Sequence, residues 1–262
     1  MERSDITAWL AERARRFAAS GAVPVRPRPA STVVLLRQTD AQPEVYLLRR
    51  ATTMAFAGGM YAFPGGSVSP SDAEPTPWAG PSPAQWARRL RLDEQAARAL
   101  VCAAVRELFE ESGVLLAGPD AGAVLTDVTG PDWEAARLAL LARRQSLADV
   151  LVGHHLVLRA DLLAAWSRWV TPEFEPRRYD TYFFVAEVPA GQITREVGGE
   201  ASATAWVRPP DALAATYLML PPTTTTLHEL SGYPDVAAVL AAAAGRDAAT
   251  AVRPRFAAPP SS

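Results

Sequence analysis

The strongest constraint in this sequence is a set of three glutamates inside an otherwise apolar helical stretch. Glu107, Glu110 and Glu111 stand at positions i, i+3 and i+4, which share one face of an α-helix. Val105 and Phe109 belong to a second, apolar face that suits packing on a core. Three carboxylates this close repel one another unless a cation lies between them. A solvated acidic helix end is the alternative interpretation.

A hard divalent cation is the ligand that such a face favours. Carboxylate oxygens and water are what Mg²⁺ accepts, and Mn²⁺ is its usual substitute, so we expect the three glutamates to bind one of these metals. Arg106 lies one helical turn before Glu110 and can orient a carboxylate through a charge-assisted hydrogen bond. Upstream, Gly65 and Gly66 permit close backbone approach, and the Gly66 carbonyl is a further candidate metal ligand.

Together these residues resemble the signature of the Nudix hydrolases. That signature reads Gly, five residues, Glu, seven residues, then Arg-Glu-aliphatic-any-Glu-Glu-any-Gly-aliphatic. The chain supplies, in order, Gly66, Asp72, Arg106, Glu107, Leu108, Glu110, Glu111, Gly113 and Val114. Asp72 replaces the first Glu, and 33 residues separate it from Arg106 where the signature has seven. An insertion at this place is characteristic of the branch that contains the peroxisomal coenzyme A diphosphatases.

The resemblance implies a fold and a reaction. The implied fold is α+β, a Nudix-type α/β/α sandwich with a mixed sheet and additional helices. The implied reaction is attack of a metal-activated water on a phosphorus atom of a diphosphate in a nucleoside diphosphate derivative. The chain is thus identified as a member of a family of enzymes.

The resemblance also assigns roles to individual residues. Asp72, Arg106 and Gly113 support the signature helix, while the three glutamates and Gly66 hold the metal. A general base is still needed. Glu110 is the candidate within the signature. Outside it, Glu200 is the candidate and Glu196 the alternative.

Coenzyme A or acyl-coenzyme A is the substrate that this branch implies, cleaved to 3′-phosphoadenosine 5′-phosphate and a 4′-phosphopantetheine derivative. The planar guanidinium of arginine can donate two hydrogen bonds to the 3′-phosphate that distinguishes coenzyme A. Because the chain contains no lysine, arginine side chains are the candidates for this contact. The substrate-binding candidates are Arg50, Gly59, Gly65 and Arg178, with Arg49 and Arg177 beside them. A coenzyme A segment of another Nudix branch fits only at Arg50 and Gly59, because Ala55 and Ala57 stand where it has Arg and His. The alternatives are hydrolysis of ADP-ribose, NADH or another nucleoside diphosphate derivative, and a weakly catalytic Nudix-fold sensor that binds a nucleotide.

Composition excludes several other partners. With 26 basic and 28 acidic residues, the net charge of −2 provides no electrostatic surface for nucleic acid or an anionic membrane. The longest apolar run, 236–244, is about half of what a bilayer span needs. We expect a cytoplasmic protein that binds a small-molecule substrate, with a homodimer left open.

The chain divides by pattern into three parts. Residues 1–28 form a helix and linker, 29–245 the Nudix domain and 246–262 a flexible tail. Within the domain, the insertion 73–98 is expected to be a flap or a dimer contact. The expected helices cover 5–19, 84–112 with breaks, 133–147, 160–169, 209–217 and 235–244, with a further helix beginning at Leu227 that the threonines 223–226 cap. The expected strands cover 31–37, 44–50, 178–188 and 203–207.

Overall fold

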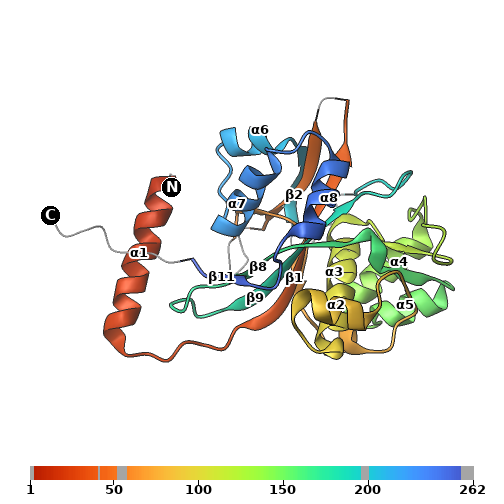
Figure 1. Ribbon diagram of the computed structural model, residues 1–262, viewed down its shortest axis with the longest axis horizontal. Helices are drawn as coiled ribbons and strands as arrows, with labels where there is room; N and C mark the ends of the chain where they lie inside the picture. The colour runs from red at the N-terminus through yellow and green to blue at the C-terminus, as the bar shows by residue number, and fades with distance from the viewer. Residues whose placement is uncertain (1–2, 41, 52–57, 196–200, 255–262) are drawn as a thin grey trace.

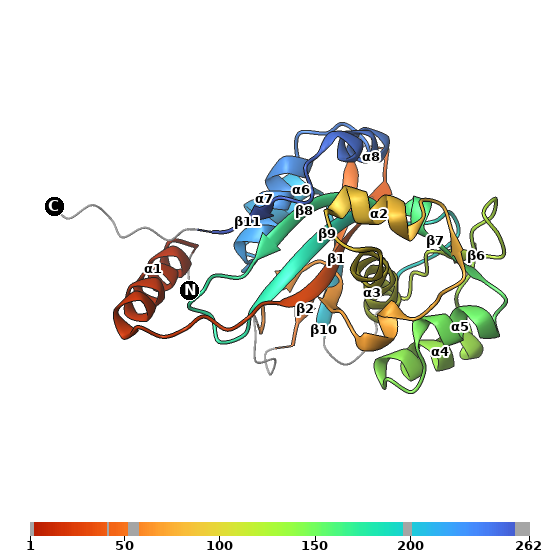
Figure 2. The ribbon, with the colours of Figure 1, turned by 60° about the horizontal axis from the view of Figure 1, so that its bottom comes forward.

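A mixed β-sheet between two layers of helices forms the body of the protein. The computed structural model describes residues 3–40, 42–51, 58–195 and 201–254. In Figures 1 and 2, α2 to α5 lie on one side of the sheet and α6 to α8 on the other. The predicted α+β fold, an α/β/α sandwich with additional helices, is confirmed.

The helices are α1 (Arg3–Ser20), α2 (Pro83–Leu90), α3 (Glu94–Ser112), α4 (Pro131–Leu141), α5 (Leu147–Gly153), α6 (Pro209–Ala214), α7 (Pro221–Leu230) and α8 (Val236–Gly245), with 3₁₀ turns η1 (Pro70–Ala73) and η2 (Ala160–Leu162). The main sheet contains β1 (Arg28–Gln38), β2 (Pro43–Arg50), β3 (Tyr61–Ala62), β4 (Gly65–Ser67), β8 (Ala164–Val170), β9 (Tyr179–Glu187), β10 (Ala201–Val207) and β11 (Ala251–Val252). A smaller sheet contains β5 (Trp78–Ala79), β6 (Ala117–Gly118) and β7 (Val157–Arg159). No helix in the described ranges is long and apolar enough to cross a bilayer.

The strand order of the main sheet is β10-β2-β1-β9-β8-β11, with β3 paired to β2 and β4 to β1. The two central strands, β1 and β9, run parallel, and Arg28 lies opposite Tyr179. Strand β4 pairs antiparallel with β1, with Gly65 opposite Thr32. This pairing fixes Gly65 and Gly66, the first two residues of β4, which we call the glycine turn, beside the central strand β1.

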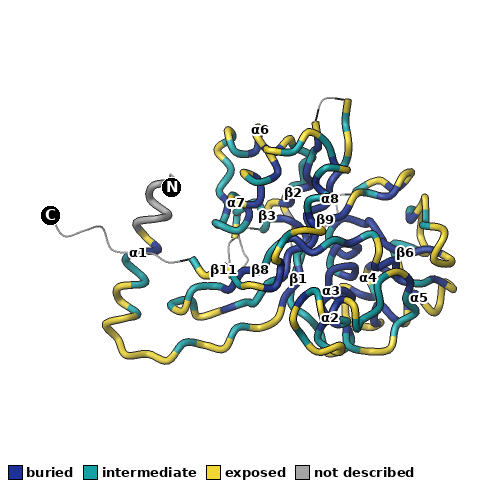
Figure 3. Tube along the Cα trace, viewed as in Figure 1, coloured by how far each residue is buried: buried dark blue, intermediate teal, exposed yellow. Residues whose placement is uncertain are grey.

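Strand β1 shows why both faces of the sheet are covered. Val33 and Leu35 pack in the core beneath α2 and α3, whereas Val34 and Leu36 pack beneath α7 and α8. Alternate residues of a strand point to opposite faces, and all four of these are fully buried. Figure 3 shows the buried trace running along this central layer.

The segment 160–169, expected as a helix, is instead the turn η2 followed by strand β8. Ala165 joins the core on one face of the sheet and Trp166 the core on the other. Strand β8 pairs antiparallel with β9, and that pairing overrides the helical preference of its two alanines.

Two helix boundaries also differ from expectation. The helix expected over 133–147 ends at Leu141 as α4, and an unexpected helix, α5, begins at Leu147; Arg143, with a left-handed φ of 55°, lies in the turn between them. The helix expected to begin at Leu227 begins at Pro221, so the threonines 223–226 lie inside α7 and do not cap it. The prolines at the start of α7 occupy positions whose N–H groups need no helical partner.

The second half of the insertion 73–98 is not a free-standing flap. Helix α2 buries Trp86 and Leu90 against the sheet and α3, and the Trp86 ring lies edge-on to Phe184 with centroids 5.7 Å apart. Strand β5 of the same segment pairs with β7. Helix α2 is therefore part of the core, while a flap formed by the first residues of the insertion and a dimer contact through it stay predictions.

The two ends of the chain differ in how they pack. Helix α1 lies apart from the sheet layers (Figure 1) and is joined to the β8–β9 loop by an ion pair of 3.1 Å between Arg13 and Glu175. The described part of the expected flexible tail, 246–254, is packed. Arg246 lies 3.9 Å from the centre of the Trp166 ring, and β11 pairs with β8.

Replacing Trp86 by Ala should destabilise the protein by about 3–5 kcal/mol, because it empties a core position of the insertion. Urea unfolding followed by circular dichroism measures the change. Trp9→Ala is the matched control, since that ring is 47% exposed. A loss from Trp86→Ala no larger than that from the control would contradict a core role for α2.

Candidate active site

Helix α3 begins and ends where its sequence dictates. The Asp93 carboxylate accepts a hydrogen bond of 2.8 Å from the Ala96 N–H and caps the first turn. At the other end, the Gly113 N–H donates to the Phe109 carbonyl, and Gly113 has φ of 74°, which glycine adopts without strain. Gly113 thus stops the helix directly after the three glutamates, as the signature implies.

The glycine turn and α3 meet in space. The Gly65 N–H donates a hydrogen bond of 2.8 Å to a carboxylate oxygen of Glu111. A Cβ at Gly66 would collide with the Glu107 carboxylate. A Cβ at Gly65 would instead meet the backbone of β1, at the Ser31 carbonyl and the Thr32 Cα, so glycine is required there. The two glycines and the acidic face thus form one surface although 40 and more residues separate them in sequence.

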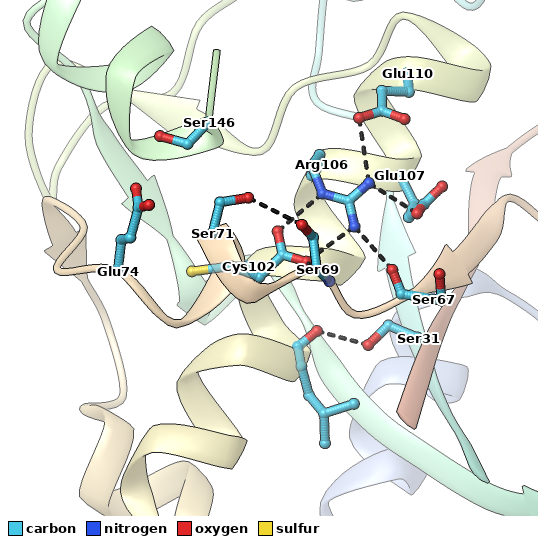
Figure 4. A network of polar contacts seen from close by, with 12 residues as sticks. Ser31, Ser67, Ser69, Ser71, Glu74, Cys102, Arg106, Glu107, Glu110 and Ser146 are labelled. Atoms are coloured by element: carbon cyan, nitrogen blue, oxygen red, sulfur yellow. Dashed lines mark hydrogen bonds and ion pairs between the residues drawn. The ribbon is translucent and has the colours of Figure 1, made fainter. Parts of the chain in front are cut away.

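Arg106 connects the two halves of this surface (Figure 4). Its guanidinium donates two hydrogen bonds of 2.8 and 2.9 Å to Asp72 and one of 3.1 Å to the Ser67 carbonyl. Further bonds reach Glu107 at 2.8 Å and Glu110 at 3.2 Å. Because Asp72 is 2% exposed and Arg106 8%, this is a buried network in which each charge depends on the others.

Burial decides the protonation of the acidic face. It raises the pKa of Glu107 to about 7, although the adjacent Arg106 favours the ionised form. Burial also raises the pKa of Glu110, against the opposing charges of Arg106 and Arg143. Two carboxyl groups with raised pKa values in one cleft are typical of sites that bind cations or transfer protons.

The acidic face opens into a cavity of about 620 Å³. The glycine turn forms one wall, with Gly65, Gly66 and Ser67, and α3 contributes Arg106 and the three glutamates. Arg50 reaches the cavity from the end of β2, and its Nε has no hydrogen-bond partner within the described residues. A volume of this size suits a nucleotide-sized ligand.

The three carboxylates share this cavity but do not converge. Glu107 and Glu110 bond to Arg106, while Glu111 bonds to the Gly65 amide. Across the described ranges, no group of three His, Cys, Asp or Glu side chains is arranged to hold a metal ion. The three carboxylates therefore do not meet at one point in this structure, and their role as joint metal ligands stays a prediction.

The structure places other predicted residues away from the cavity. Arg178 is buried and donates to the carbonyls of Thr171 at 3.1 Å and Val25 at 2.7 Å, so it holds loops together. Its neighbour Arg177 lines the cavity in its place. Gly59 does not line the cavity and instead closes the turn after β2, where its N–H donates to the Arg50 carbonyl.

Four positions of the sequence analysis lie outside the described residues: Ala55, Ala57, Glu196 and Glu200.

Sequence reasoning missed two cavity arginines, Arg143 and Arg144, because it ran one helix through them. A signal was present. Ser146 and Asp149 have the spacing of a capping box, and in the structure each side chain accepts a hydrogen bond from the other's N–H. That pattern indicates a new helix start at Leu147.

Comparisons with known proteins agree with this geometry. Residues 83–222, more than half of the chain, match the family model described as the NUDT19 Nudix domain. The chain belongs to the Nudix family. It is 30% identical over 212 residues to nudix hydrolase 7 of Caenorhabditis elegans and 28% identical over 207 residues to the acyl-coenzyme A diphosphatase NUDT19 of Xenopus laevis.

These alignments cover 79% and 65% of this Nudix chain, but only 62% and 54% of the two relatives. The chain therefore spans less than two thirds of the length of these relatives. A crystal structure of a Nudix hydrolase from Alicyclobacillus acidocaldarius is 28% identical, with a TM-score of 0.67 over 83% of this chain and 96% of that one. The Nudix fold thus extends over most of the described residues.

The raised pKa of Glu107 predicts how the stability of the metal-free protein depends on pH. An unfolded glutamate loses its proton near pH 4.5 and the folded one near pH 7, so ionisation destabilises the folded state progressively between these values. Glu107→Gln should therefore match wild type near pH 4.5 and exceed it by at most about 3 kcal/mol at pH 8. Urea unfolding in EDTA at several pH values measures this difference. An equal stability of both proteins at pH 8 would contradict it.

Replacing Arg106 by Met should destabilise the protein by about 3–5 kcal/mol, because Asp72 is left buried without its partner. Combining it with Asp72→Asn should cost clearly less than the sum of the two single changes, as expected for directly coupled groups. Chemical unfolding of the four proteins in the cycle measures this coupling. Additive losses would mean that Asp72 and Arg106 act independently.

Proposed function

We propose that this Nudix protein is a metal-dependent diphosphatase that cleaves coenzyme A or acyl-coenzyme A into 3′-phosphoadenosine 5′-phosphate and a 4′-phosphopantetheine derivative. One observation carries the proposal: the glycine turn and the acidic face of α3 form a single cavity wall, with Gly65 bonded to Glu111 and Gly66 against Glu107. Similarity to the Xenopus acyl-coenzyme A diphosphatase supports the substrate class.

The residues of this wall fit a divalent cation by their chemistry. They offer three carboxylates and, at Gly66, a backbone that approaches Glu107 without an intervening Cβ. Because Glu107, Glu110 and Glu111 already lie on one helical face, side-chain rotation alone can bring them together. Glu107, Glu110, Glu111 and the Gly66 carbonyl would hold Mg²⁺ or Mn²⁺. Such a cation would lower the pKa of a bound water and neutralise charge on the leaving phosphate.

The chain's own groups then have distinct tasks. Glu110 accepts a proton from the attacking water, a task that its raised pKa suits. Glu200 is the candidate base outside the described ranges. Arg50 and Arg177 line the cavity and bind phosphate oxygens of the substrate, since a guanidinium can bond two oxygens at once.

A substrate panel tests the proposal. Purified protein with Mg²⁺ or Mn²⁺ is given coenzyme A, acetyl-coenzyme A, ADP-ribose and NADH, and the products are separated by chromatography. The highest kcat/KM is expected for one of the two coenzyme A substrates. Faster cleavage of ADP-ribose or NADH would replace the proposed substrate, and binding without any product would favour a nucleotide sensor.

Glu111→Gln should lower kcat by about 10²-fold or more, because it removes one negative charge from the metal site and with it transition-state stabilisation. Glu94→Gln, an exposed change in the first turn of the same helix, is the matched control. Initial rates at saturating Mg²⁺ measure both variants. Turnover by Glu111→Gln equal to that of the control would remove Glu111 from the site.

A further inference from the structure

The turn between α4 and α5 is held against the catalytic helix. Arg137, on α4 and 3% exposed, donates a hydrogen bond of 3.0 Å to the main-chain carbonyl of Glu110. Helix α4 then ends, and the left-handed conformation of Arg143 turns the chain so that Arg143 and Arg144 both line the cavity. The backbone that carries them is thus anchored, through α4, to the helix of the acidic face.

Neither of these two arginines is neutralised. Arg143 and Arg144 are exposed and form no ion pair within the part of the chain that the structure describes. By contrast, Arg137 is paired with Glu134. The nearby Asp149 accepts hydrogen bonds of 2.8 and 2.9 Å from Ser146, so its carboxylate is satisfied by the helix cap.

The cavity therefore has an acidic wall on α3 and a separate basic wall at the α4–α5 turn. A ligand that satisfies both walls carries one anionic group at the glutamates with their cation and a second, separate anion at the arginines. Two adjacent guanidiniums suit a dianionic phosphate better than a single carboxylate.

We propose that Arg143 and Arg144 bind a phosphomonoester that the substrate carries apart from the diphosphate under attack. In coenzyme A this group is the 3′-phosphate of the ribose. The inference rests on the proposed function for the identity of the substrate, and it assigns a specificity site that distinguishes coenzyme A from dephospho-coenzyme A.

The double variant Arg143→Ala with Arg144→Ala tests this through the ratio of kcat/KM for coenzyme A to kcat/KM for dephospho-coenzyme A. We expect that ratio to fall by about 10- to 100-fold, the range for losing charge-assisted hydrogen bonds. The double variant Arg143→Lys with Arg144→Lys keeps the charge but loses the planar guanidinium groups. Its kcat/KM ratio should lie between that of wild type and that of the alanine variant. Arg88→Ala, an exposed arginine of α2 that does not line the cavity, is the control. An unchanged ratio in the alanine variant would overturn the proposal.

A second measurement does not depend on turnover. Calorimetry compares the Kd of 3′-phosphoadenosine 5′-phosphate with that of AMP, for wild type and for the double variant. Wild type should bind the bisphosphate more tightly, and the variant should lose that preference. If coenzyme A is not cleaved but the preference is present and lost on substitution, the proposed function fails and the arginine site stands. If coenzyme A is cleaved but wild type shows no such preference, the arginine site fails alone.

Discussion

The bidentate pair between Arg106 and Asp72 is the interaction on which the rest of the site depends. A guanidinium buried beside α3 is stable only when carboxylates and carbonyls satisfy its donors, and here Asp72, Glu107, Glu110 and the Ser67 carbonyl do so. Asp72 follows β4 and Arg106 lies on α3, so the pair that they form holds the glycine turn close to the acidic face.

The same pair explains how the signature tolerates its insertion. Loop-closure entropy grows only slowly with length, so a long connection between Asp72 and Arg106 costs little once its ends are joined. The inserted residues also add to the core, since Trp86 and Leu90 of α2 are buried against the sheet and α3. The insertion thus extends the packed helical layer without moving the glycine turn away from the glutamates.

Charge is divided unevenly within the cavity. The acidic wall is buried, and burial raises the pKa values of Glu107 and Glu110, which leaves these groups in need of positive charge. Arg106 supplies part of this positive charge through its ion pairs with Glu107 and Glu110. The exposed Arg143 and Arg144 also line the cavity, and within the described residues neither forms an ion pair with the glutamates. This separation allows one cavity to attract a cation and a polyanionic ligand together.

The sequence by itself determined the acidic face of α3, its stop at Gly113 and the neighbouring strands β1 and β2, because these depend on local spacing and backbone conformation. It also identified the family through the residues that build the cavity wall. Only the tertiary structure decided that 164–170 is a strand, that Arg177 and not Arg178 faces the cavity, and that the carboxylates turn to Arg106 and Gly65. Those outcomes depend on partners far away in the chain, and no pattern of neighbouring residues encodes a partner that only folding brings into contact.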